Sequence, residues 1–197
     1  MKTFRSLTFI LLFVPGSLVI AQSQAFVFTL YGGLFLPSNI DFRSNYKSNS
    51  DLIWGVGIGL PMSSTLFATG DLSYFNVKGI ADPTIDSTLK LEERFIHIGV
   101  LNKQPLTGTF FIRLSGGISY TTAKQILSSN RTQATTVEAD KKLGYYGGIG
   151  IEQPLDPQGH LSLFADLIYD YRRSERKELY GDYGGIRVIL GIHMIMF

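Results

Sequence analysis

The chain has 197 residues, 45% of them hydrophobic and 17% charged, with a formal net charge of +2 and no cysteine. This length suits one domain, the charged fraction lies below the roughly 25% of typical soluble domains, and the lack of cysteine excludes disulfides and thiolate metal sites. Of the 18 basic residues, Lys2 and Arg5 lie at the N-terminus, which leaves 16 to balance the 16 acidic residues. A balanced chain has no concentrated basic surface for nucleic acid, and we expect no nucleic-acid partner.

The first stretch, MKTFRSLTFILLFVPGSLVIAQSQA, has the pattern of an export signal. Lys2 and Arg5 form a positive start, Leu7 to Ile20 is apolar, and Ala21 or Ala25 supplies the small residue before a cleavage site. The apolar run is shorter than the about 20 residues that a membrane-spanning helix needs. We predict a signal peptide over residues 1–21, cleaved after Ala21 or Ala25, and one domain over residues 22–197.

The rest of the chain alternates between apolar and polar residues with a period of two, which is typical of strands with one apolar face. In TFFIRLSGGISYTT, for example, Ile112 and Leu114 share one face while Arg113 and Ser115 share the other. The pattern predicts an all-β domain with eight strands. They cover residues 26–36, 51–60, 65–77, 91–102, 109–123, 141–153, 161–173 and 183–197.

The connections between these strands alternate in length. Three are short and marked by proline, at Pro61, at Pro105, and at Pro154 and Pro157. Four are long and polar, and they cover residues 37–50, 78–90, 124–140 and 174–182. Short turns at one end and long loops at the other are typical of an up-and-down barrel in the bacterial outer membrane. Such a sheet must close in lipid, because an open edge would leave unpaired backbone groups.

The aromatic residues sort by end of this barrel, as girdles at the two membrane interfaces would. Tyrosine and tryptophan gather near the long loops, and phenylalanine gathers near the short turns. The interface aromatics predicted in this way are Trp54, Tyr74, Tyr120, Tyr145, Tyr169, Tyr171, Phe67 and Phe110.

The signal peptide, the eight strands, the alternating connections and the terminal Phe197 resemble the small OmpA/OmpX-type eight-stranded barrels. The AQSQA junction and the glycine-rich strands YGGLFLP and YYGGIGIEQPL resemble the outer-membrane β-barrel domain common in Bacteroidetes. This resemblance covers residues 22–197. It implies an integral outer-membrane protein with both termini in the periplasm, and it implies that the barrel-assembly machinery reads Phe197 as a C-terminal signal.

The alternation also places charged residues inside the predicted barrel. An eight-stranded barrel is just wide enough for side chains to fill, so buried charges must be paired. We predict a network centred on Arg113 with Asp71 and Asp166 that plugs the lumen; a narrow polar path or a small-solute site is the alternative. The predicted lumen charges are Asp71, Arg113, Glu152, Asp166, Asp170 and Arg187, and we expect Glu93 and His97 to join them.

No motif in the chain predicts catalysis. The glycine clusters GVGIG and GYYGGIG lack the spacing and the following helix of a nucleotide-binding loop. His97, His160 and His193 are the three histidines, and none has an obvious serine nucleophile beside it. No spacing of histidines or carboxylates indicates a metal site. We expect no enzyme activity, cofactor or metal, with a lipid-modifying enzyme as a remaining alternative.

The long loops are the remaining candidates for function. The basic loop YRRSERKELYGD, at residues 171–182, suits either contact with lipopolysaccharide phosphates or a solvated surface of mixed charge. The leading hypothesis is a non-enzymatic outer-membrane barrel with an envelope-structural or loop-mediated binding role. Its expected partners are outer-membrane lipid, lipopolysaccharide and the barrel-assembly machinery. A secreted barrel with an apolar ligand is the soluble alternative.

Overall fold

The structure is a computed structural model that describes residues 25–38, 46, 50–82, 87–106, 108–129, 132–138, 143–174, 181–182 and 184–197. The predicted signal peptide over residues 1–21 and residues 175–180 of the basic loop at 171–182 lie outside these residues. Among the described residues, no helix is both long and apolar enough to cross a membrane.

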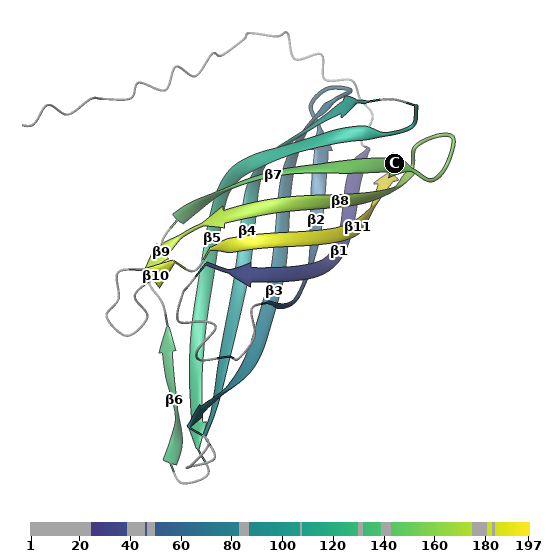
Figure 1. The fold of residues 1–197 in the computed structure, drawn as a ribbon. Coiled ribbons are helices and arrows are strands. Elements are labelled where there is room, and N and C mark those ends of the chain that lie inside the picture. The colour runs from purple at the N-terminus through teal and green to yellow at the C-terminus, as the bar shows by residue number, and fades with distance from the viewer. Residues whose placement is uncertain are drawn as a thin grey trace, which may run out of the picture.

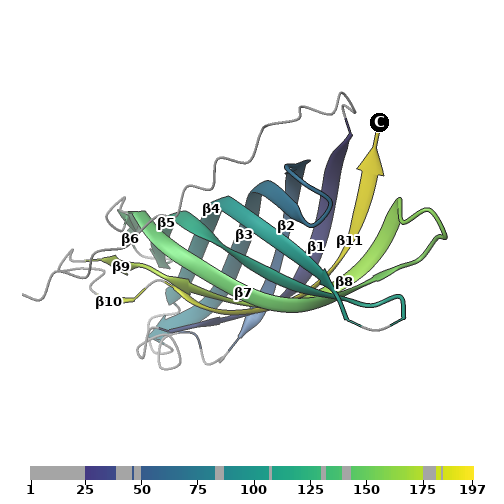
Figure 2. The ribbon, with the colours of Figure 1, turned by 90° about the horizontal axis from the view of Figure 1, so that it is seen from above.

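Eight antiparallel strands close into a barrel (Figures 1 and 2). Each strand pairs with its neighbour in the chain, and the last pairs with the first from Phe26↔Met196 to Pro37↔Gly185. The predicted all-β, eight-stranded barrel is therefore confirmed. Its strands are β1 (Phe26–Pro37), β2 (Asp51–Pro61), β3 (Leu66–Asp82), β4 (Ser87–Pro105), β5 (Phe111–Ser129), β7 (Leu143–Pro154), β8 (Leu161–Tyr171) and β11 (Gly185–Met196).

One end of the barrel, the short-turn end, carries tight connections. In the β7–β8 turn, Asp156 accepts hydrogen bonds from the backbone N–H groups of Leu161 at 2.6 Å and His160 at 3.1 Å. These bonds favour the carboxylate and hold the pKa of Asp156 below its ordinary value. Gly108 and Gly159 adopt φ values of 60° and 73°, which glycine reaches without a steric penalty.

The opposite end, the long-loop end, differs from the sequence prediction. Residues 78–90 and 124–140 were expected to be long loops, but β3, β4 and β5 continue through much of them, and β6 (Thr132–Glu138) adds a further strand beside β5. Two small strands, β9 (Arg173–Ser174) and β10 (Gly181–Asp182), also pair at this end.

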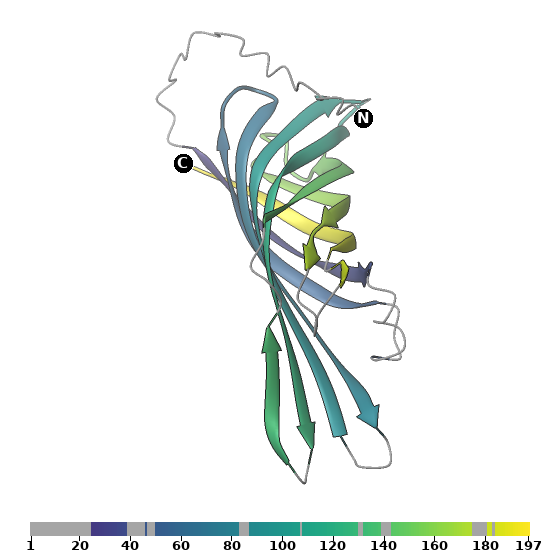
Figure 3. The ribbon, with the colours of Figure 1, turned by 90° about the vertical axis from the view of Figure 1, so that its left-hand side faces the viewer.

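These extended strands leave the barrel wall. The pairing of β2 with β3 stops at Phe75, and the pairing of β7 with β5 stops at Tyr120. Beyond these points the strands continue the same sheet as an extension that projects past the barrel (Figures 1 and 3). We call it the protruding sheet. It consists of residues 75–82 of β3, 87–93 of β4, 123–129 of β5 and all of β6.

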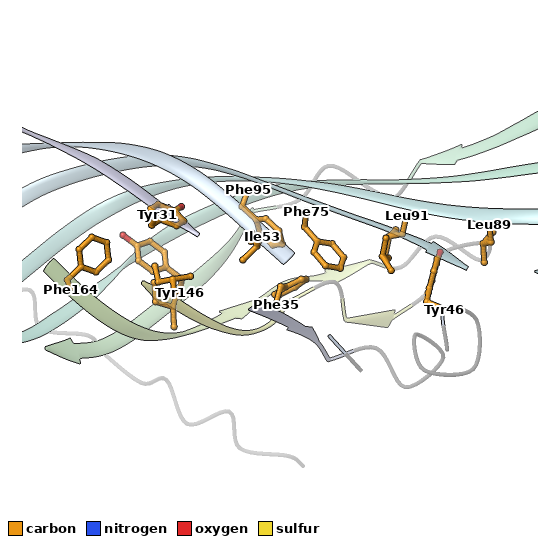
Figure 4. Packing of buried hydrophobic residues seen from close by; sticks show 13 residues of the cluster. Tyr31, Phe35, Tyr46, Ile53, Phe75, Leu89, Leu91, Phe95, Tyr146 and Phe164 are labelled. Carbon is orange, nitrogen blue, oxygen red and sulfur yellow. The ribbon is translucent and has the colours of Figure 1, made fainter. Parts of the chain in front are cut away.

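An apolar core links the lumen to this sheet (Figure 4). The ring of Phe35 packs edge-on against Phe75 at 4.9 Å and against Phe95 at 5.2 Å between ring centroids. Farther out, Tyr46 from the β1–β2 connection packs with Leu89 and Leu91. The protruding sheet is thus anchored on its inner face.

Candidate functional site

The barrel wall is apolar outside and polar inside. On β5, Ile112 and Leu114 face outward while Arg113 is buried in the lumen. The buried polar and charged residues are Ser73, Glu93, His97, Arg113, Ser119, Thr121, Glu152, Ser162, Asp166, Asp170, Arg172, Arg187 and His193. Such side chains need hydrogen-bonded partners because unpaired buried charge is costly.

The charges nearest the short turns form the short-turn cluster. Arg113 donates from Nε to Asp166 Oδ1 at 2.8 Å and from Nη2 to Oδ2 at 3.0 Å, a bidentate pair. Glu152 accepts from Arg113 Nη1 and from Lys103 Nζ, the latter at 2.6 Å. His193 Nδ1 lies 3.1 Å from Glu152 Oε2. The two cations of this cluster, Lys103 and Arg113, balance its two carboxylates, Glu152 and Asp166.

A second group, the long-loop cluster, lies toward the other end of the lumen. His97 sits between two carboxylates, with Nδ1 2.9 Å from Asp71 Oδ1 and Nε2 2.6 Å from Asp170 Oδ1. Asp71 also accepts from the hydroxyl of Tyr31 at 2.7 Å, and Arg187 Nε lies 2.7 Å from Asp170 Oδ2. Both ring nitrogens of His97 therefore face a carboxyl oxygen, and Arg187 lies beside the same ring, with Nη2 3.3 Å from Nε2.

A cavity of about 70 Å³ lies between the two clusters, with Asp71 on one side and Arg113 on the other. Thr29, Thr69 and Ser115 contribute polar groups to its wall. Together the two clusters fill the lumen on both sides of this cavity.

This arrangement corrects the predicted network, in which Arg113 paired with both Asp71 and Asp166. Register explains the difference. Arg113 lies opposite Gly150, which lies opposite Asp166, so the guanidinium reaches across a position without a side chain. A Cβ at Gly150 would clash with Asp166 Oδ1. Asp71 instead lies directly opposite His97 and belongs to the long-loop cluster.

The lumen also contains partners that sequence reasoning missed. Lys103 and Tyr31 were not named, although Lys103 shares the odd-numbered inner face of β4 with Glu93 and His97. His193 was named among the three histidines but was not assigned to the lumen network. Whether a side chain points into the lumen follows from its odd or even position along its strand. Its partner across the lumen depends on the stagger of all eight strands.

Most of the aromatic residues expected at the interfaces lie on or beside the outward face of the barrel. Trp54 and Tyr74 are neighbours there with ring centroids 5.9 Å apart, and Tyr145 stacks on Tyr171 at 4.9 Å. Tyr169, Tyr120 and Phe110 share this orientation. Phe67 is a correction, because its ring lies on the inner face of β3, where Lys103 Nζ is 4.9 Å from the ring centroid.

The histidines do not form a recognisable catalytic arrangement. Both nitrogens of His97 meet carboxylates, and His193 lies among the charges of the short-turn cluster. His160 lies in the β7–β8 turn, with its ring centroid 5.1 Å from that of Phe197. Across the described ranges, no group of three or more metal-ligating side chains is placed to hold a metal ion.

The two faces exchange polarity where the barrel wall becomes the protruding sheet. In the barrel, β4 turns Ile96 and Ile98 outward and His97 inward. In the protruding sheet the same strand turns Lys90 outward and buries Leu91. The strand alternation continues without a break through this change. The outward face is therefore suited to lipid around the barrel and to water around the protruding sheet.

Lys90 and Glu92, on the outward face of the protruding sheet, form a local ion pair. Lys90 Nζ donates to Glu92 Oε1 at 2.5 Å, and this hydrogen bond, with the charges of Lys90, Lys124 and Arg94, holds the pKa of Glu92 below its ordinary value. On the inner face, burial raises the pKa of Tyr46 to about 12, although its oxygen accepts a hydrogen bond from Gln125 Nε2 at 2.9 Å.

The protruding sheet has two open edges. β6 pairs only with β5, and β3 beyond Phe75 pairs only with β4 among the described residues. An open edge presents unpaired N–H and C=O groups to which another strand can be added.

Solved structures share this architecture. Ail, the attachment invasion locus protein of Yersinia pestis, in complex with the heparin analogue sucrose octasulfate, matches with a TM-score of 0.57 and 11% identity, over 87% of this chain and 97% of that one. The fold is that of the small eight-stranded outer-membrane barrels.

Two further structures support this assignment. A major outer membrane protein from Thermus thermophilus matches with a TM-score of 0.56 and 14% identity, over 87% of this chain and 99% of that one. Neisserial surface protein A matches with a TM-score of 0.54 and 12% identity, over 87% of this chain and 97% of that one. No protein-family model and no curated protein sequence matches the chain.

Proposed function

We propose that this protein is a non-enzymatic integral outer-membrane protein whose barrel anchors a protruding sheet that binds partners outside the cell. The proposal rests on the reversal of polarity along β4. In the barrel wall the apolar Ile96 faces outward, and in the protruding sheet the apolar Leu91 faces inward. An apolar outward band suits lipid, and a charged outward face above it suits water. A sheet held stiffly beyond the membrane by three continuous strands is placed to meet other molecules.

The orientation follows from the same proposal. The short-turn end, with both the start of β1 and the end of β11, faces the periplasm, and the long-loop end faces the medium, as in outer-membrane barrels generally. The apolar start of the chain, which is typical of an export signal, supports this direction.

The open edges indicate how binding occurs. β6 has the sequence TQATTVE, which is rich in β-branched residues, lacks proline and carries one charge. Such an edge suits the addition of an extended segment from another protein, held by backbone hydrogen bonds. Ail, whose fold is similar, is described as an attachment protein.

The lumen favours an anchor over a channel. Two ion-paired clusters fill it on either side of a cavity of about 70 Å³. We expect no stable conductance in planar-bilayer recordings of the purified barrel. Sustained conductance would instead support a narrow channel, and a change in lipid A acylation on mass spectra that is lost in His97→Ala would support a lipid-modifying enzyme.

A shortened variant tests the binding role. Residues 78–90 and 124–138 are each replaced by a tight turn, so that β3, β4 and β5 end at the barrel rim. Cells that display the parent protein are expected to adhere to surfaces coated with proteins that expose extended segments, and cells with the shortened variant are expected to lose this adhesion. Heat modifiability on gels serves as the control for a folded barrel. Equal adhesion by a folded shortened variant contradicts the proposal.

Assembly is the second expected interaction. Phe197 is 82% exposed at the short-turn end, beside His160. We propose that the barrel-assembly machinery recognises this ring. Deleting Phe197 is expected to leave secretion intact and to reduce the fraction recovered in the outer membrane. Unchanged recovery would remove this role.

A further inference from the structure

A groove interrupts the apolar outward face of the barrel at Gly70. It has a volume of about 350 Å³, and the side chains of Val56, Ile58, Leu72 and Ile98 line it. Packing does not require glycine here, because a Cβ at Gly70 would meet only the backbone oxygen of His97, at 3.8 Å. Glycine weakens a strand, so its presence at an open position is consistent with a site that something else fills.

A basic patch lies on the same outward face, just beyond the groove. Gly70 on β3 lies directly opposite Ile98 on β4. Four residues farther along each strand, Tyr74 on β3 lies directly opposite Arg94 on β4. This separation is about 13 Å along the strand. After another four residues on each strand, Lys78 lies directly opposite Lys90. Of these two lysines, Lys90 has an acidic partner on its own strand, Glu92.

The acidic neighbours of the patch leave it positive. Its cations are Lys78, Lys90, Arg94 and Lys124, and its acids are Glu92 and Glu138. Glu92 binds Lys90 at 2.5 Å, and Lys124 lies opposite both acids in the strand register. Lys78 and Arg94 form no ion pair with any residue that the structure describes, so they remain available for a ligand.

We propose that the outward face of β2, β3 and β4 binds a phosphorylated, acylated lipid of the outer leaflet. An acyl chain fills the Gly70 groove, one phosphate group of the same lipid binds Arg94, and a second phosphate group binds Lys78 farther out. This inference rests on the proposed membrane location but differs from the predicted contact through the basic loop at 171–182. The bound lipid would hold the base of the protruding sheet at the membrane surface.

A second groove on the barrel serves as an internal control. It lies at Gly147, has a volume of about 320 Å³, and is lined by Ile149, Leu167 and Tyr169. A Cβ at Gly147 would also meet only one atom, at 4.0 Å. The outward faces of β7, β8 and β11 carry no basic residue in the described range. This groove offers space for an acyl chain without a site for phosphate.

Native mass spectrometry of the full chain released from nanodiscs tests the proposal. The nanodiscs contain bisphosphorylated lipid A, the same lipid without its phosphates, or phosphatidylglycerol. The parent protein is expected to retain one lipid A molecule in preference to the other two lipids. Free inorganic phosphate is expected not to compete at millimolar concentration, because it lacks the acyl chain.

Two variants separate the parts of the site. Lys78→Gln with Arg94→Gln is expected to reduce the preference for the phosphorylated lipid about thirtyfold, since each of the two basic side chains at a membrane surface adds about 1 kcal/mol. Gly70→Leu is expected to fill the groove and reduce retention of lipid A, while Gly147→Leu leaves it unchanged.

The outcomes distinguish this inference from the proposed function. Equal retention of phosphorylated and dephosphorylated lipid, or equal loss in Gly70→Leu and Gly147→Leu, overturns the lipid site while the adhesion result stands. Failure of the chain to insert into nanodiscs overturns both.

Discussion

Three strands, β3, β4 and β5, run from the barrel wall into the protruding sheet, and the polarity of their two faces is reversed on the way. Around the lumen, β3 points Asp71 and Ser73 inward and Leu72 outward. A few residues farther on, the same strand points Phe75 and Val77 inward and Lys78 outward. The backbone geometry is common to both regions, and the environment on the outward side is what differs.

This difference shows that the membrane boundary is marked by a change of polarity and not by the end of a strand. In lipid, the outward side chains must be apolar, and the interior takes the polar groups. In water, the preference is reversed, and the inner face becomes a small apolar core beneath Tyr46. The predictions below test how far the two regions obey these separate rules.

The largest expected effect comes from breaking a lumen ion pair. Arg113→Met leaves Asp166 and Glu152 with one fewer cation in a buried cluster, and we expect a loss of about 3–5 kcal/mol in the free energy of unfolding. Urea unfolding in detergent micelles, followed by tryptophan fluorescence, measures it. Lys78→Met on the outward face of the protruding sheet is the control, with an expected change within about 0.5 kcal/mol. Similar losses in both variants would mean that the ion pairs in the lumen contribute no more to the free energy of unfolding than a surface lysine does.

A charge placed on the outward face is expected to separate the two regions directly. Ile98 and Ile126 both face outward, Ile98 in the barrel wall and Ile126 in the protruding sheet. Ile98→Lys is expected to cost about 2–4 kcal/mol because it exposes a charge to lipid. Ile126→Lys is expected to cost less than about 0.5 kcal/mol. Unfolding from lipid bilayers measures both, and equal costs would contradict the proposed membrane boundary.

The apolar core of the protruding sheet is expected to be separable from the barrel. Leu91→Ala removes a buried side chain from this core and is expected to destabilise it by about 2 kcal/mol. Backbone amides of β6 and of residues 123–129 are then expected to exchange hydrogen faster, while those of the barrel do not. Faster exchange throughout the barrel would show that the two regions unfold as one unit.

The smallest expected effect concerns Tyr46. Its pKa is raised from 10.0 to about 12 by burial, so the folded state favours the protonated phenol. The contribution of Tyr46 to the protruding sheet is therefore complete below pH 10 and declines as the pH rises through about 12. Amide exchange of β6 across this range, compared with Tyr46→Phe, measures the decline. Equal pH dependence in the two proteins would contradict it.

Sequence reasoning predicted the barrel well because lipid imposes a strict pattern. The period of two placed Arg113, Asp166 and Asp170 on the inner face and Trp54 on the outer face, as the structure shows. The protruding sheet was missed because residues 78–90 and 124–140 are largely polar and were interpreted as loops. In the described part of the first segment the period of two continues with the polarity reversed, with Leu89 buried and Lys78 and Lys90 on the outward face.

Phe67 shows a second limit of the same reasoning. Its position near a short turn suggested a girdle residue, but its odd position on β3 shares a face with Asp71. Its odd position along the strand predicts the direction of its side chain correctly, since neighbouring residues of a strand point to opposite faces.

The amino-acid sequence by itself determined the strand pattern, the two ends of the barrel and the direction in which most side chains point, because each depends on neighbours along one strand. Only the tertiary structure decided that the lumen charges divide into two clusters and that Gly150 makes room for the pairing of Arg113 with Asp166. The stagger between strands sets these partners. It depends on closure of all eight strands at once, so no single segment of the sequence encodes it.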